Sequence, residues 1–299
     1  MKEYSAQEWL PSASGLGESP LYRAIDKTFF FVDIKSQLVH QVPVSGRWEQ
    51  RKTYEFDQPI TRLEAVANRT DVLAVQTRLG IALLSLETGT LKDIATIQHG
   101  DRGLDAKVRM NDGAVDAKGR WWAGSMALDE EESIGRLWCM DKGPSEASTA
   151  SVRELDNLVE TPVPNGPVFS SDDKIMYVSE TPGGKIFKYD YDTNDGSVSN
   201  KRLFVKLENG GMPDGMAVDA DDHVWVAANS RGKLVRYSPS GEAVATCVVP
   251  GAKMTSCPAF GGDDLRTLFI TSIASDGSSG HVYKFQVDTP GIKRHEYKS

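Results

Sequence analysis

The amino-acid sequence predicts an all-β fold, a six-bladed β-propeller of four-stranded antiparallel blades. Short β-rich runs bounded by Gly, Asp, Asn and Pro recur along the 299 residues, whereas stretches with the apolar period of a helix are scarce. Residues 109–126 and 212–228 share one order of features: a polar residue with Gly, an apolar run, an Asp turn and a Trp-containing strand. Such units recur roughly every 40–55 residues, which is the period of a propeller blade.

A polar residue is expected on the innermost strand of each unit, and we call these residues the anchors. In chain order the anchors are Glu18, Glu64, Asn111, Asn165, Asp214 and Ser256. The strands expected between them include residues 28–33, 38–42, 72–76, 80–85, 136–140, 174–179, 185–190, 223–227, 233–237, 267–271 and 281–285. Because blades stack around a central axis, the anchors should converge there. We therefore expect residues 1–299 to form one propeller domain, since a β-sandwich or two barrels would leave the repeated anchors unexplained.

Composition narrows the classes of partner. The net charge of -8 and the absence of a Lys/Arg run argue against nucleic-acid binding. No apolar run approaches the ~20 residues of a membrane span, and residues 1–5 lack the apolar region of a signal peptide. Three widely spaced cysteines, with no C-x-x-C, favour a reducing compartment. These features predict a cytoplasmic protein, a monomer or small homo-oligomer, with a small-molecule partner.

Three anchors carry the chemistry expected of a metal site. Glu18, Asn165 and Asp214 offer two carboxylates and an amide oxygen at one end of the axis. Asn165 and Asp214 are each followed by Gly, which permits a tight backbone turn. Unpaired carboxylates gathered there would repel each other, and a divalent cation removes that repulsion. An all-oxygen set suits Ca²⁺, Mg²⁺ or Mn²⁺, and Zn²⁺ tolerates it.

Histidine chemistry is not expected, because no histidine coincides with an anchor. The five histidines are His40, His99, His223, His281 and His295. We expect His99 and His295 to be exposed, and neither a histidine-based zinc site nor a Ser-His-Asp triad. Arg109 and Asn111 are two apart on an extended segment and share a face, so together they suit an anionic or polyhydroxylated ligand. The alternative is that Arg109 pairs with a neighbouring Asp.

Short motifs in order along essentially the whole chain carry a family resemblance. They are Gly17–Pro20, Arg109–Gly113, Pro164–Gly166, Pro213–Met216, Phe260–Gly262 and Leu268–Ser272. With these motifs the sequence resembles the SMP-30/gluconolactonase/regucalcin-like family of six-bladed propellers. The resemblance implies one divalent metal ion held by Glu18, Asn165 and Asp214 and completed by water, with Arg109 and Asn111 binding substrate.

Two positions depart from the family pattern. Asp129 falls where the family often has a substrate-contacting Glu. Because Asp is one methylene shorter, either the substrate contact changes or a neighbour such as Glu130 supplies it. Pro167 replaces a plain aliphatic residue and is expected to stiffen the loop that holds Asn165. Both departures leave the fold and the metal site intact but put the substrate in question.

The function expected from these residues is metal-dependent hydrolysis of a sugar lactone or a similar small lactone. The metal would polarise the carbonyl, and Asp214 would act either as general base for water or directly as nucleophile. A calcium-binding regulatory protein without turnover is the alternative from another class. The same site acting on an organophosphate or a specialised metabolite is a third interpretation, because fold and metal do not fix the substrate.

Overall fold

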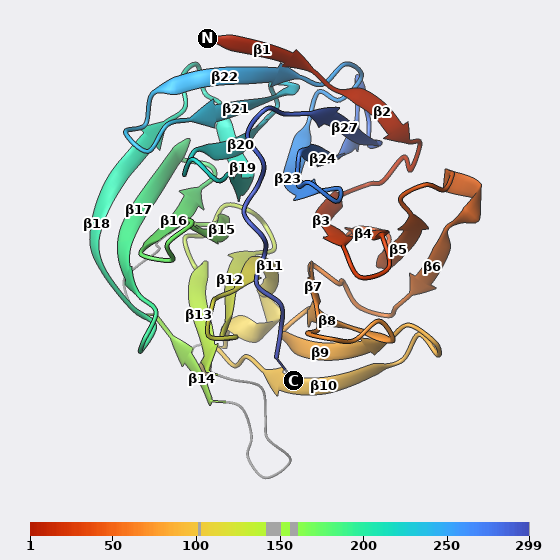
Figure 1. Cartoon of the computed structure of the whole chain (residues 1–299). Helices are drawn as coiled ribbons and strands as arrows, with labels where there is room; N and C mark the ends of the chain where they lie inside the picture. The colour runs from red at the N-terminus through yellow and green to blue at the C-terminus, as the bar shows by residue number, and fades with distance from the viewer. Residues whose placement is uncertain (101–102, 142–150, 156–160, 299) are drawn as a thin grey trace.

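The computed structural model describes residues 1–100, 103–141, 151–155 and 161–298. Six antiparallel sheets are arranged around a common axis, which confirms the predicted propeller (Figure 1). In each blade the strand that carries the anchor lies nearest the axis, and the strands that pair in succession from it lie progressively further out (Figure 1). Within the described residues the only helical segments are two short 3₁₀ turns, η1 (Trp48–Gln50) and η3 (Leu104–Ala106). No helix among them is long and apolar enough to cross a bilayer.

The strands follow the repeat unit read from the sequence. Blade 1 contains β3 (Gly17–Arg23), β4 (Thr28–Asp33), β5 (Leu38–Pro43) and β6 (Lys52–Glu55), and blade 2 contains β7 (Arg62–Ala65), β8 (Val72–Thr77), β9 (Gly80–Ser85) and β10 (Leu91–Thr96). Blade 3 contains β11 (Val108–Val115), β12 (Trp121–Ala127), β13 (Arg136–Asp141) and β14 (Ser151–Glu154), and blade 4 contains β15 (Pro164–Phe169), β16 (Ile175–Glu180), β17 (Lys185–Asp192) and β18 (Ser197–Lys206).

The last two blades also take strands from the N-terminus. Blade 5 contains β19 (Met212–Val218), β20 (Val224–Asn229), β21 (Lys233–Tyr237) and β22 (Ala243–Val248), and blade 6 contains β23 (Thr255–Gly261), β24 (Thr267–Ser272) and β27 (Val282–Gln286), with a small hairpin of β25 (Ala274–Ser275) and β26 (Ser278–Ser279). The outermost strand of blade 6 is β2 (Gln7–Leu10), which pairs antiparallel with β27 and so joins the two ends of the chain.

Blade 5 departs from the expected four strands. Strand β1 (Lys2–Ser5) pairs in parallel with β22 and makes a fifth strand, with Lys2 opposite Ala245. Only Ala6 separates β1 from β2, so a chain that completes blade 6 also passes along the edge of blade 5. The added strand satisfies backbone groups that an outer edge would otherwise leave unpaired.

The hydrophobic core is divided among the interfaces between blades. Six clusters of buried apolar side chains each join residues of two neighbouring blades. Strand β4 illustrates the reason, because Phe30 packs towards blade 2 whereas Phe29 and Phe31 pack towards blade 6. Both faces of a blade are therefore buried, which explains why its strands form continuous apolar runs rather than alternating patterns. Cys139, Cys247 and Cys257 are buried free thiols in this framework.

Candidate metal and substrate site

A β-bulge interrupts five of the six innermost strands at the same place. The register shifts lie between Glu18 and Leu21, Met110 and Gly113, Asn165 and Val168, Pro213 and Met216, and Thr255 and Pro258. A bulge leaves residues unpaired and re-aims their side chains. The anchors Glu18, Asn111, Asn165, Asp214 and Ser256 all lie at or inside these bulges, near the start of their strands. The repeat therefore places polar side chains at one end of the axis.

Glu18, Asn165 and Asp214 come from blades 1, 4 and 5, and the structure brings them to this end of the axis. Burial raises the pKa of Glu18 well above its ordinary value, and the carboxylates of Asp214 and Asp112 raise it further. Burial likewise raises the pKa of Asp214 to about 7; a hydrogen bond from Asn229 opposes the rise and the Asp112 carboxylate adds to it. The site thus holds two carboxylates that repel each other. Their role as metal ligands stays a prediction.

A chain of hydrogen bonds fixes the amide of Asn165. Arg109 Nη1 donates to Asn111 Oδ1 (2.9 Å), and Asn111 Nδ2 donates to Asn165 Oδ1 (3.0 Å). Asn165 Nδ2 donates to Thr181 Oγ1 (2.9 Å), whose hydroxyl donates to the carbonyl of Pro213 (2.7 Å). Because the Thr181 proton is used on that carbonyl, its oxygen must accept from Asn165. The relay therefore crosses blades 3, 4 and 5 and turns Asn165 Oδ1 towards Asn111.

The two glycines that follow Asn165 and Asp214 serve different purposes. Gly166 adopts a φ of +89°, a conformation that favours glycine, and its peptide bond to Pro167 is cis. Gly215 is required by packing, because an added Cβ would lie 2.5 Å from Cys257 Sγ. The predicted tight turn therefore applies to Gly166, whereas at Gly215 the reason is the close approach of blade 6.

Arg109 does not pair with a neighbouring Asp. Its Nη1 donates to the carbonyl of Met110 and to Asn111, and within the described part of the chain these are its hydrogen bonds to protein. Burial lowers the pKa of Arg109, while the charges of Glu130, Glu18 and Asp214 oppose the change. Most donors of its guanidinium are therefore free for a ligand beside the two carboxylates.

Asp129 and Glu130 differ in orientation. Asp129 is exposed, and its Oδ1 accepts hydrogen bonds from the backbone amides of Glu131 (2.9 Å) and Glu132 (3.1 Å), which lowers its pKa. Glu130 adopts a φ of +60°, and its charge acts on both Arg109 and Asp214. A substrate contact by Asp129 stays a prediction, and the structure adds Glu130 to the residues near Arg109.

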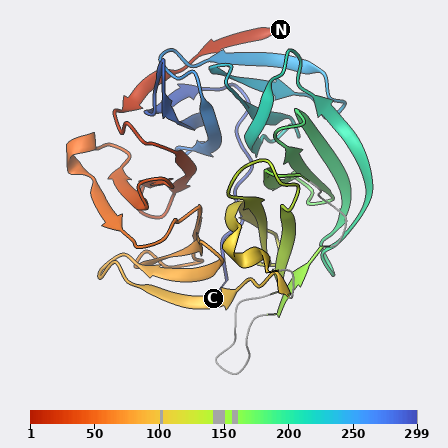
Figure 2. The same ribbon diagram turned by 180° about the vertical axis from the view of Figure 1, so that it is seen from behind.

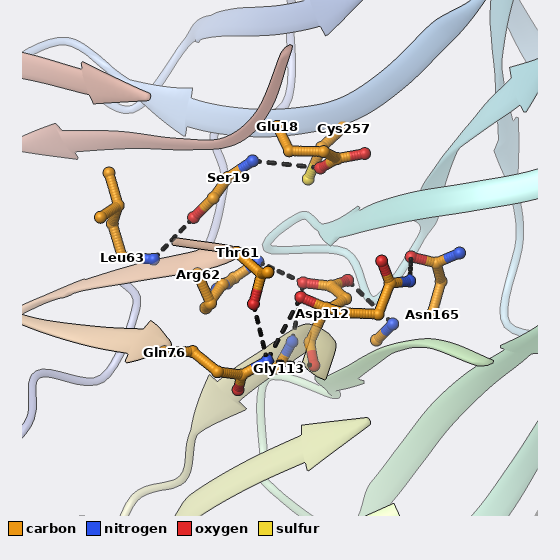
Figure 3. Close-up of polar contacts among 12 residues, drawn as sticks. Glu18, Ser19, Thr61, Arg62, Leu63, Gln76, Asp112, Gly113, Asn165 and Cys257 are labelled. Atoms are coloured by element: carbon orange, nitrogen blue, oxygen red, sulfur yellow. Dashed lines mark hydrogen bonds and ion pairs between the residues drawn. The ribbon is translucent and has the colours of Figure 1, made fainter. Parts of the chain in front are cut away.

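Asp112 is a residue that the sequence motif contained but whose role it did not reveal. Its Oδ1 accepts from Arg62 Nη1 (2.8 Å), and its Oδ2 accepts from the amide of Gly166 (2.8 Å) (Figure 3). Asp112 therefore ties blade 3 to blades 2 and 4 directly behind the anchors. Asn229 and Thr181 were also not foreseen, and both lie at the ends of strands adjoining the anchors, where no repeated pattern singles them out.

The anchor of blade 2 behaves differently from the others. Strand β7 has no bulge, and Glu64 is only 1% exposed, with Oε1 accepting from Arg62 Nε (2.8 Å) and from Arg294 Nη2 (2.5 Å). Arg294 belongs to the C-terminal segment, which crosses one end of the axis (Figure 1) and lies behind the blades in the reverse view (Figure 2). Bridges of this segment to Val66 and Asp219 place it over the ends of the inner strands, opposite the starts that carry the anchors.

Two histidines are less exposed than expected, because His295 is half-buried and His99 is fully enclosed. His99 is buried, with Nδ1 2.9 Å from Asp105 Oδ1 and Nε2 3.1 Å from Ser125 Oγ. This resembles the order of a catalytic triad, but Ser125 is fully buried and also accepts a hydrogen bond from Trp138 Nε1 (3.1 Å). No substrate carbonyl has room at that hydroxyl, so the arrangement supports strand packing behind Arg109.

A second acidic group lies away from the anchors. Asp219, Asp221 and His223 have potential ligand atoms within 4.8 Å of one another. Asp219 is already engaged, however, because Arg236 Nε donates to its Oδ2 (2.7 Å) and backbone amides donate to its Oδ1. Its charge is compensated by protein, unlike the charges of Glu18 and Asp214. These three residues therefore stabilise the turn before β20 through hydrogen bonds to Asp219.

Comparison with known proteins agrees with this architecture. The family model described as SMP-30/gluconolactonase/LRE-like region matches residues 16–274. The chain is 32% identical over 303 residues to the pentonolactonase XacC of Haloferax volcanii, with 95% of this chain and 94% of that protein covered. It is 30% identical over 285 residues to regucalcin of Oryctolagus cuniculus, with 95% and 91% covered. The solved structure of a calcium-binding regucalcin from Agrobacterium tumefaciens shares the fold, with a TM-score of 0.86 and 21% identity over 100% of both chains. By sequence and fold, this chain belongs to the SMP-30/gluconolactonase/LRE-like family.

Proposed function

We propose that this protein is a divalent-metal-dependent lactonase that opens the ester ring of a sugar lactone. The observation that carries the proposal is the meeting of the half-buried carboxylate of Glu18 with the buried carboxylate of Asp214, beside the Arg109–Asn111 pair. Among the described residues neither carboxylate forms an ion pair with a cationic side chain. The family includes gluconolactonases, and a relative of 32% identity is named a pentonolactonase. A hexono- or pentonolactone is accordingly the substrate class.

The donor set fits a hard divalent cation. Glu18, Asn165 and Asp214 would hold it, since all three offer oxygen atoms. Burial and repulsion between carboxylates raise the pKa values of Glu18 and Asp214, and a bound divalent cation would offset both effects. Ca²⁺, Mg²⁺ and Mn²⁺ match such oxygen donors, and Zn²⁺ tolerates them. The relative of solved structure described as calcium-binding supports Ca²⁺ as the first ion to test.

Asp214 is the proposed catalytic residue. One of its oxygens accepts from Asn229 Nδ2 (2.8 Å), which leaves the other oxygen to take a proton from the attacking water. When bound at this site, a divalent cation would supply Lewis-acid polarisation of the lactone carbonyl and stabilise its developing charge. The proton on Asp214 would then pass to the ring oxygen that leaves. Direct attack by Asp214 on the carbonyl is the alternative form of the mechanism.

Arg109 and Asn111 would position the substrate. The free donors of Arg109 suit the hydroxyls and carbonyl of a sugar lactone, and the relay to Asn165 holds Asn111 in place. On the opposite side of Arg109, either Asp129 or Glu130 would accept hydrogen bonds from ring hydroxyls. The charge of Glu130 at Arg109 and Asp214 favours Glu130.

The test is a screen of lactones with chelator-treated protein. Acid release from gluconolactone and xylonolactone would be followed in a pH-stat after reloading with Ca²⁺, Mg²⁺, Mn²⁺ or Zn²⁺. We expect hydrolysis only in the reloaded samples. Hydrolysis that persists unchanged with chelator would remove the metal from the proposal.

A calcium-binding role without turnover is the second candidate, and the regucalcin relatives favour it. Cation binding by calorimetry together with no acid release from any lactone would support this role. The free donors of Arg109 argue against it, because a protein that binds only a cation needs no hydrogen-bond donors for a substrate.

A further inference from the structure

One buried polar atom next to Asp214 has no partner. Asn229 ends strand β20 and is 6% exposed. Its Nδ2 donates to Asp214 Oδ2 (2.8 Å), whereas its Oδ1 finds no hydrogen-bond partner among the described residues. A buried carbonyl oxygen without a donor costs free energy, and such atoms in folded proteins are few. The oxygen is therefore expected to meet a donor that belongs to a bound group.

The orientation of this amide is fixed by its neighbour. Rotating the amide by half a turn would place Oδ1 against the Asp214 carboxylate, where two acceptors would repel each other. The nitrogen therefore stays on Asp214, and the oxygen lies on the other arm of the same planar group. Its lone pairs therefore remain available to a donor of a bound group.

We propose that Asn229 is a positioning residue that orients both Asp214 and the attacking water. This inference rests on the proposed lactonase function. The water donates one O–H to the free oxygen of Asp214 and the other to Asn229 Oδ1, so that a lone pair of the water oxygen faces the lactone carbonyl carbon. When the new C–O bond forms, the first proton passes to Asp214 and the second remains as the hydroxyl of the tetrahedral intermediate. As the ring C–O bond breaks, the proton on Asp214 passes to the leaving oxygen.

Asn229 approaches Asp214 from a different strand than the anchors do. The anchors lie on innermost strands, whereas Asn229 lies on β20, one strand further out, with Met212 as its cross-strand partner. It reaches Asp214 because the bulge after Pro213 turns that side chain back towards β20. A donor from this direction occupies one oxygen of Asp214 and leaves the other for the reaction.

The test uses two variants of Asn229 and a matched control in the full chain. N229L removes the donor and the acceptor while keeping the branching and the number of heavy atoms, and N229A does so with a smaller side chain. The control N200G removes an exposed Asn-to-Asp hydrogen bond, from Asn200 Nδ2 to Asp190 Oδ2 (2.7 Å), at a residue whose φ of +52° suits glycine. Ca²⁺ affinity would be measured by titration calorimetry, kcat and KM on gluconolactone at saturating Ca²⁺, and folding by circular dichroism.

We expect N229L and N229A to weaken Ca²⁺ binding by about 10- to 100-fold, as loss of a residue that orients a metal ligand does. At saturating Ca²⁺ we expect kcat to fall by roughly 10- to 100-fold with little change in KM, because water is misplaced while substrate binding is kept. N200G should match the parent protein. Folded Asn229 variants with the affinity and kcat of N200G would overturn the proposal. Weakened Ca²⁺ binding with unchanged kcat would overturn the role in orienting water.

Failure of the lactonase proposal would be recognised separately. If the parent protein hydrolyses no lactone under any cation, the proposed function fails, but the calorimetric comparison still tests whether Asn229 orients Asp214. Unchanged Ca²⁺ affinity in both folded Asn229 variants would then reject that role as well.

Discussion

The two ends of the propeller axis contain similar residue types in opposite electrostatic states. Towards the end crossed by the C-terminal segment, the carboxylate of Glu64 meets the guanidinium groups of Arg62 and Arg294. At the other end, the carboxylates of Glu18 and Asp214 have no cationic partner within the described part of the chain, and burial together with neighbouring carboxylates raises their pKa values. Charges that the protein itself neutralises serve the fold, whereas charges left unpaired indicate a ligand.

The C-terminal segment covers one end of the axis, which we call the closed end. Arg294 enters from the C-terminal segment, donates to Glu64 and to the carbonyl of Pro20 (2.9 Å), and so ties this segment to blades 1 and 2. A cavity of about 80 Å³ remains between the segment and the inner strands, with apolar residues such as Phe169 and charged residues such as Arg294 in its wall. Substrate is therefore expected to enter from the anchor end.

The largest effect on activity is expected from removing one of the unpaired carboxylates at the anchor end. We expect D214A to lower kcat/KM on a lactone by about 100- to 10,000-fold, because the proposed general base is lost. The propeller should remain folded, since Asp214 repels Glu18 rather than stabilising it. Steady-state kinetics and circular dichroism would measure both effects.

The control for D214A is D221A, the same substitution at an exposed position of blade 5. It should keep full activity. A D214A protein that is as active as D221A would exclude Asp214 from the mechanism and leave the anchor end without its proposed catalytic residue.

A substitution at the end crossed by the C-terminal segment should lower the stability of the fold rather than the activity. E64Q leaves Arg62 and Arg294 facing a neutral amide, and breaking such a buried ion pair costs about 3–5 kcal/mol. The free energy of unfolding, from denaturant titration, should fall by that amount while kcat of the folded protein is maintained. The control E180Q alters a partly exposed carboxylate 3.5 Å from Lys185 and should change stability by less than about 1 kcal/mol. Equal stability of the two variants would contradict the structural role of the closed end.

The two ends should also differ in their response to pH, because the carboxylates with raised pKa values among the described residues, Glu18 and Asp214, both lie at the anchor end. In the metal-free folded state, Glu18 and Asp214 keep protons at pH values where unfolded carboxylates have lost theirs. Stability from these groups is therefore present below the unfolded pKa of about 4 and is lost as pH rises through the folded pKa. A cation binds the ionised forms, so the stabilisation it gives should grow over the same range and then level off.

This linkage can be measured as the difference in Tm between samples with Ca²⁺ and samples with chelator, across pH. At a Ca²⁺ concentration about 100 times Kd the stabilisation should approach 2.7 kcal/mol above the folded pKa values. In E18Q, the pH dependence of this difference should be smaller because one of the two carboxylates is gone. A difference in Tm that is independent of pH would show that the cation does not compete with protons at these residues.

The parts of the fold that the sequence predicted are those that repeat. The anchors recur with the blade, so their place on innermost strands followed from spacing and was confirmed in all six blades. The added strand β1 was not predicted, because it is four residues with no repeat and only its proximity to β2 brings it to blade 5. A short terminal segment carries too little pattern to show which edge it joins.

Pairing of charges was harder to predict than their position. The sequence placed Glu64 among the anchors, yet its partner Arg294 lies 230 residues away and reaches it only because the C-terminal segment crosses the axis. Asp112 similarly meets Arg62 at a separation of 50 residues. His99 was expected to be exposed and is buried, because its ring contacts Ser125 and Trp138. Such contacts depend on tertiary structure and leave no local signal.

The smallest expected effect concerns the cation at the anchor end, Arg109. R109K keeps the charge but replaces a planar fork of donors with a single ammonium group. We expect KM for the lactone to rise by about tenfold, equivalent to about 1.4 kcal/mol, with kcat nearly unchanged. Ca²⁺ affinity should be retained, because Asn111 Nδ2 still donates to Asn165 Oδ1 (3.0 Å) and to the carbonyl of Pro164 (3.1 Å).

R136K supplies the matched control, since Arg136 lies in the same blade and pairs with Glu154 (3.2 Å) away from the anchors. Its kinetics should equal those of the parent protein. If R109K lowered kcat and KM stayed constant, Arg109 would act on the transition state rather than on substrate binding. If R109K weakened Ca²⁺ binding instead, the hydrogen bonds from Arg109 through Asn111 would be needed to hold Asn165. Substrate binding by Arg109 and metal binding by Asn165 would then be coupled.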